Sequence, residues 1–166
     1  MKYFTFIILL YLLTACEQST SIETSEDIFA IYLLKDSTIT AKKAFSYSVD
    51  SLTLTPSSFL TVNGFKSYAW NSHSFELKGT AWSKFESFLL SKRCTSGVPF
   101  VVTVGNNRIY LGTFWWGFSS NLPPACAVIN ASGPLPHKIY LAGDAVDKRS
   151  DSRIYYSLKK SGILVE

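Results

Sequence analysis

Two apolar runs on either side of a short turn constrain the fold of this chain more than any other feature. Pro99–Val104 and Arg108–Phe118 are rich in β-branched and aromatic residues, which favour strands. Gly105-Asn106-Asn107 lies between them, and these residue types accept positive φ angles. Two β-forming runs joined by such a turn are typical of a hairpin, so the middle of the chain predicts two neighbouring antiparallel strands.

Further short β-forming runs predict more strands around this hairpin. Ile28–Leu34 is apolar without interruption, as in a strand buried on both faces. Phe65–Trp70 and Phe75–Leu77 flank the turn-forming Asn71-Ser72, which predicts a second hairpin. The remaining predicted strands are Leu52–Leu54, Ala125–Ile129 and Lys138–Leu141.

Helical patterns are fewer, and each has one apolar face. Thr80–Arg93 carries aromatic and aliphatic residues at helical spacing, with Thr80 as the expected N-cap. A closing helix is expected after Ser150 or Asp151, ending at Gly162, and a short helix over Ala41–Phe45. Amphipathic helices need a sheet to cover. The sequence therefore predicts an α+β domain with a mainly antiparallel sheet and one or two amphipathic helices packed on it.

The N-terminus has the pattern of an export signal. Lys2 precedes the apolar run Tyr3–Leu13, and Leu13-Thr14-Ala15-Cys16 follows as a small-residue cleavage site. With Cys at the cleavage point, the first 16 residues resemble the lipobox of bacterial lipoproteins. The resemblance implies cleavage before Cys16 and attachment of palmitate-type acyl chains to Cys16. An ordinary secretory signal is the alternative; a membrane span would need about 20 apolar residues.

This interpretation divides the chain into three parts. Residues 1–15 are a signal peptide, residues 16–27 are a Ser/Thr/Glu-rich tether, and residues 28–166 form a single domain. The expected location is the bacterial cell envelope, where the lipid on Cys16 holds a periplasmic or outward-facing domain to a membrane. Val98–Pro124 and Asp147–Leu164 are also similar to uncharacterised exported bacterial domains, a resemblance that implies no activity.

The charge pattern argues against a nucleic-acid partner. The chain has 16 basic and 12 acidic residues, and the basic ones occur as scattered pairs rather than as a track. Such pairs are typical of a solvated surface.

Two cysteines remain if Cys16 carries lipid. An even pair in an oxidising compartment suggests a disulfide between Cys94 and Cys126. Two buried free thiols are the alternative, and a catalytic thiol is a third interpretation. The sequence around neither cysteine matches a known nucleophile signature.

The candidate binding surface lies on and after the second strand of the central hairpin. Tyr110, Phe114 and Trp116 alternate onto one face, where exposed rings could stack on sugars or bind a protein. The alternative is a strand buried on both sides. The polar loop that follows, with Ser119, Ser120 and Asn121, is a second candidate.

The histidines offer no recognisable metal site. His73 and His137 have neither HxH nor HExxH spacing, and both are expected to face solvent or to bond locally. The sequence predicts no metal and no cofactor.

Three functions remain compatible with these features. The first is non-enzymatic binding of a protein, peptide or glycan by a lipid-anchored envelope domain. The second is an envelope hydrolase or thiol enzyme that uses Cys94 or Cys126 with a histidine. The third is a purely structural envelope lipoprotein. The lack of any catalytic constellation favours the first, so we do not expect an enzyme.

Overall fold

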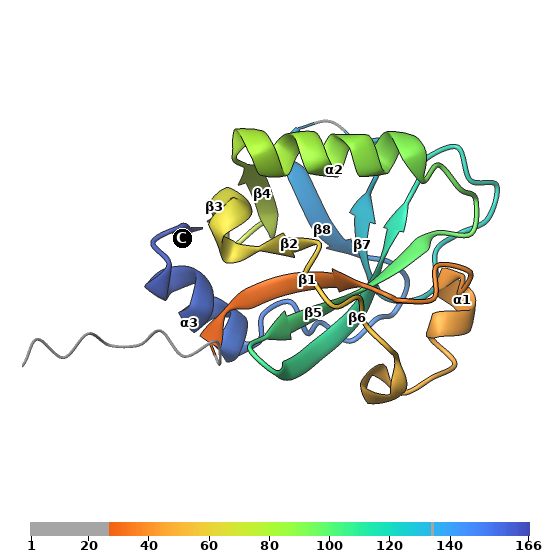
Figure 1. Cartoon of the computed structure of the whole chain (residues 1–166), viewed down its shortest axis with the longest axis horizontal. Helices are drawn as coiled ribbons and strands as arrows, with labels where there is room; N and C mark the ends of the chain where they lie inside the picture. Colours follow the sequence, from red (N-terminus) through yellow and green to blue (C-terminus); the bar gives the residue numbers. More distant parts are fainter. Residues whose placement is uncertain (1–26, 134) are drawn as a thin grey trace, which may run out of the picture.

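The computed structural model describes residues 27–133 and 135–166 (Figure 1). The expected signal peptide, Cys16 as the expected lipid attachment site, and all but the last residue of the expected tether lie outside the described residues. No helix in the described part is both long enough and apolar enough to span a bilayer.

The described residues form one strongly curled sheet with three α-helices (Figure 1). The strands follow the order β2-β1-β5-β6-β7-β8-β4-β3-β9. Their bounds are β1 Phe29–Leu33, β2 Leu60–Thr61, β3 Phe65–Ala69, β4 Ser74–Leu77, β5 Val98–Val104, β6 Asn107–Trp115, β7 Ala127–Asn130, β8 His137–Leu141 and β9 Leu164–Val165.

Both predicted hairpins are present, and the α+β class is confirmed. β5 pairs with β6 across Gly105, whose φ of +56° matches the expected turn, and β3 pairs with β4. The expectation of a mainly antiparallel sheet is wrong, because the sheet is mixed. β7 lies parallel to β6 and β9 lies parallel to β3. A connection of irregular structure after β6 returns the chain to the level of Gly112, so that β7 runs in the same direction as β6.

Three α-helices lie against this sheet: α1 Ala41–Ala44, α2 Gly79–Ser91 and α3 Ser152–Lys160. Thr40 caps α1 by accepting from the Lys43 amide, and Asp151 caps α3 by accepting from the Arg153 amide. Thr80, the expected cap of α2, lies inside that helix; Lys78 is its N-cap and makes no side-chain capping bond. Gly162 follows α3 with φ +67°, the left-handed geometry expected at this position.

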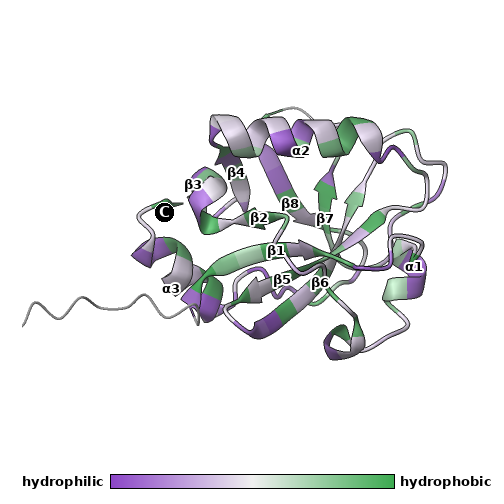
Figure 2. Ribbon diagram, viewed as in Figure 1, coloured by the Kyte–Doolittle hydropathy of each residue, from purple (hydrophilic) through white to green (hydrophobic). Residues whose placement is uncertain are grey.

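The core lies on both faces of the sheet. Phe85 and Phe88 of α2 and Ile154 and Leu158 of α3 share one cluster with the inner faces of the central strands. On the other face, α1 and the segment that follows it cover Val101, Trp115 and Val128 in two smaller clusters. Figure 2 shows hydrophobic residues along β1 and mainly hydrophilic ones on α3. The central strands are therefore buried on both sides.

Candidate binding groove

The three rings proposed from the sequence as an aromatic platform are buried. Tyr110, Phe114 and Trp116 are 6%, 0% and 2% exposed. Phe114 lies beneath α2, with its ring centroid 5.0 Å from that of Phe88, and Trp116 Nε1 donates to the Leu89 carbonyl oxygen at 3.3 Å. The platform interpretation is therefore wrong for these residues. The alternative holds, because α2 covers Phe114 and Trp116 and Tyr110 is buried in the same core cluster.

The polar loop after β6 stays at the surface. Ser120 and Asn121 are exposed, and Ser119 is half-buried because its Oγ donates to the Thr95 carbonyl oxygen at 2.7 Å. That bond holds the loop against the segment between α2 and β5. The loop therefore has a fixed place beside the cavities described next.

The first cavity lies where β1 ends and β5 begins, and its volume is about 280 Å³. Leu33, Phe88, Val98 and Pro99 supply its apolar lining. These residues come from two neighbouring strands and from the C-terminal turn of α2, which meet here because β1 and β5 are antiparallel partners. The cavity can accept an aliphatic side chain.

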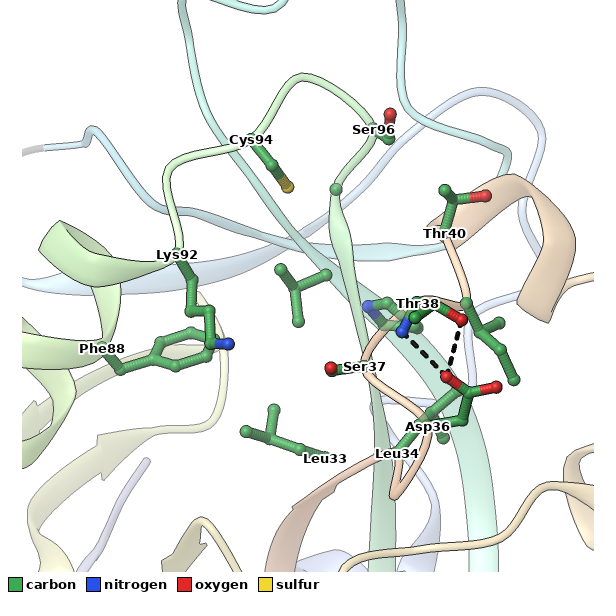
Figure 3. Close-up of a pocket in the computed structure, with 14 residues that line it drawn as sticks. Leu33, Leu34, Asp36, Ser37, Thr38, Thr40, Phe88, Lys92, Cys94 and Ser96 are labelled. Atoms are coloured by element: carbon green, nitrogen blue, oxygen red, sulfur yellow. Dashed lines mark hydrogen bonds between the residues drawn. The ribbon is translucent and has the colours of Figure 1, made fainter.

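Polar groups surround this apolar lining (Figure 3). Lys92 and Ser37 point toward the middle of the cavity from opposite sides. The Asp36 carboxylate accepts from the Thr38 amide at 2.9 Å and from the Thr38 hydroxyl at 2.7 Å. These bonds lower the pKa of Asp36, the side-chain bond contributing most. Asp36 therefore already has partners within its own loop, whereas the Lys92 ammonium extends into the cavity.

A second, larger cavity of about 540 Å³ adjoins the first. Both cavities are lined by Thr40 and Ser96, and the Ala41 amide donates to the Ser96 carbonyl oxygen at 3.2 Å between them. The other residues of the second cavity are Lys42, Thr95, Trp115, Asn121, Leu122, Pro123 and Pro124. We call the two adjoining cavities the groove. It begins with the apolar pocket under α2 and ends at the polar loop that contains Asn121.

The two cysteines are free thiols in the structure and occupy different clusters. Cys94 is half-buried and lines the first cavity. Cys126 is buried with Ala41 and Trp115 under α1, and burial raises the pKa of its thiol to about 12. The expected Cys94–Cys126 disulfide is not formed here, and thiol counting tests it in solution.

Both histidines are buried, contrary to the expectation that they face solvent. His73 has a φ of +51° and lies with its Nδ1 3.1 Å from the Tyr68 hydroxyl, so local bonding is correct for this residue. Burial lowers its pKa, and the nearby Arg149 guanidinium lowers it further. His137 packs among aromatic rings, and its buried Nε2 has no hydrogen-bond partner in the described part.

The residues expected to form a thiol enzyme are not brought together. Within residues 27–133 and 135–166, no hydrogen bond joins either thiol to either imidazole. His73 Nε2 instead lies 3.5 Å from the Ser150 hydroxyl, and neither His73 nor Ser150 lines either cavity of the groove. No cluster of three or more potential metal ligands occurs among the described residues.

Comparison with known proteins gives no relative from which a function could be inferred. No protein-family model, no curated protein and no solved structure matches the chain.

The first cavity could not be found by reasoning from the sequence. Its walls come from residues 33–40 and 88–99, which are far apart in the chain. Taken separately, each segment has the sequence of an ordinary turn that follows a strand or a helix. Only the pairing of β1 with β5 brings them together. The loop with Asn121 was found because its Ser, Asn and Pro residues follow directly on a strongly predicted strand.

Proposed function

We propose that this protein is a lipid-anchored cell-envelope domain that binds a protein or peptide in the groove and is not an enzyme. The observation that carries the proposal is the pair of adjoining cavities that share Thr40 and Ser96. A groove with an apolar pocket at one end and polar groups beyond it suits an extended chain, which fixes one side chain and leaves its backbone to polar contacts.

The position of the groove supports an anchored binding domain. Asp27, the first described residue, lies beside α3, where its carbonyl oxygen accepts from the Ser157 hydroxyl. β1 leads from that end to Leu33 in the groove, and α1 lies at the opposite end of the molecule from α3 (Figure 1). A tether that joins at Asp27 therefore leaves the groove facing away from the lipid.

A peptide is favoured over a glycan as the ligand. Sugar faces are recognised by exposed aromatic rings, and the three rings that suggested such a platform are buried. The first cavity is instead lined by Leu33, Val98 and Pro99, which suit an aliphatic side chain.

The anchor is tested by changing Cys16. Cys16→Ser is expected to abolish incorporation of a fatty-acid probe and to release the protein from membranes. A variant that still takes up the probe and sediments with membranes shows that the lipobox interpretation is wrong.

The groove is tested by filling it. Peptides selected from a displayed random library on the purified mature lipoprotein are expected to lose binding to Ser37→Phe, because the new ring occupies the first cavity. Ser57→Phe adds the same ring to an exposed loop that lines neither cavity, and should bind the peptides normally. Equal binding to both variants would place the ligand outside the groove.

A further inference from the structure

The groove is framed by a long stretch of chain that contains no acidic residue. Between Glu86 and Asp144 the sequence has neither Asp nor Glu. This stretch supplies the end of α2, the segment before β5 and the loop after β6, which together form much of the groove. That part of the wall therefore carries no negative side chain.

The charged residues that line the groove differ in whether another residue pairs with their charged group. Lys92 lines the first cavity and Lys42 the second, and no salt bridge between described residues involves either of them. Asp36 is the single acid among the described lining residues, and Thr38 engages its carboxylate through two hydrogen bonds. The groove therefore presents two ammonium groups and one carboxylate, a net charge of +1, and Thr38 holds the carboxylate within its own loop.

We infer that the groove selects acidic peptides, with an aliphatic side chain in the first cavity and carboxylates near Lys92 and Lys42. This inference rests on the proposed function and adds the chemistry of the ligand. The apolar lining supplies binding energy without regard to charge, whereas the two lysines decide which flanking residues are tolerated. Basic flanking residues would meet like charge on the wall.

The arrangement also predicts how the selectivity depends on salt. The groove is open to solvent, so ions screen its lysines; the Debye length is about 10 Å at 0.1 M salt. The preference for acidic peptides should therefore weaken as salt is added. The contribution of the aliphatic side chain should persist.

The test compares short fluorescent peptides that share one central Leu and differ in their flanking residues. On the mature lipoprotein at low salt, Glu-flanked peptides are expected to bind about tenfold more tightly than Lys-flanked ones. Lys42→Glu combined with Lys92→Glu should abolish or reverse this preference. Lys78→Glu combined with Lys138→Glu makes the same charge change outside the groove and should keep it.

The outcomes separate this inference from the proposed function. If Ser-flanked or Lys-flanked peptides bind as tightly as Glu-flanked ones and Ser37→Phe still blocks them, the charge inference is overturned while peptide binding stands. If no peptide binds the wild-type protein, both are overturned. An acidic preference that survives the double Lys substitution also overturns the inference, since the lysines would not be its cause.

Discussion

The imidazole of His137 stacks on the indole of Trp82, with ring centroids 5.5 Å apart and planes 25° from parallel. The contact joins β8 to α2, and edge-on Phe85 closes the site at 4.9 Å. Burial among these rings removes the water that would solvate a charged imidazolium. Burial accordingly lowers the pKa of His137 below its ordinary 6.5.

This burial makes the stability of the fold sensitive to acid. His73 and His137 both have lowered pKa values in the folded protein, so below about pH 6.5 the unfolded chain binds protons more readily. Their stabilising effect is complete above that pH and decreases as the pH falls toward the folded values. Urea unfolding at about pH 7.5 and about pH 5 should show lower stability in acid.

His137→Phe isolates the contribution of this residue. Phe keeps a ring on Trp82 and removes both the titration and the unpartnered Nε2. We expect unchanged or higher stability at neutral pH and a weaker loss in acid, with the remaining loss due to His73. A variant with the full pH dependence of the wild type would show that His137 does not titrate between the two states.

Trp116 provides a further test, because the sequence suggested an exposed ring and the structure buries it. Since the ring is 2% exposed and bonded to Leu89, Trp116→Ala is expected to cost about 3–5 kcal/mol of unfolding free energy, measured by thermal melting. Phe118→Ala removes a ring that is half exposed on the following loop and should lower the melting temperature far less. Similar small losses for both would contradict the burial of Trp116.

The difference between these two rings shows what the sequence could and could not predict. Alternation along residues 108–118 correctly predicts a strand, which ends earlier than expected, at Trp115, and Tyr110, Phe114 and Trp116 do share one side in the same core cluster. It does not say whether that face is covered. α2 was itself predicted from its own helical spacing, but which strands it covers follows from tertiary packing that leaves no local pattern.

The same difference between local pattern and tertiary packing explains why the sheet was predicted only in part. Local patterns predict β5–β6 and β3–β4 because a short turn forces antiparallel pairing. The β6–β7 pair depends on where an irregular connection returns, and β2 and β9 are two residues long, too short for any periodicity. The groove is a product of these long-range pairings, so the sequence could identify only its loop with Asn121.

Gly112 is predicted to be intolerant of any side chain. A Cβ at this position would overlap the Phe100 ring and lie 2.8 Å from the Ala127 carbonyl oxygen. Gly112→Ala should therefore lower the unfolding free energy by about 1–3 kcal/mol, as overpacking does. Gly79→Ala is the matched control, because nothing lies within 4 Å of the added methyl at the start of α2, and chemical denaturation should show no loss there.

Thiol reactivity gives the last prediction and also decides the redox state of the cysteines. The thiolate is the reactive species, and burial raises the pKa of Cys126 to about 12, so iodoacetamide at mild pH should leave Cys126 unmodified in the folded protein. Cys94 is half-buried at the groove and should be modified first. Peptide mapping by mass spectrometry, with and without urea, identifies each site. With free thiols, as in the structure, both cysteines react once the chain unfolds. If neither reacts in urea until a reductant is added, the Cys94–Cys126 disulfide expected from the sequence is present, and the two segments must lie closer than the structure places them.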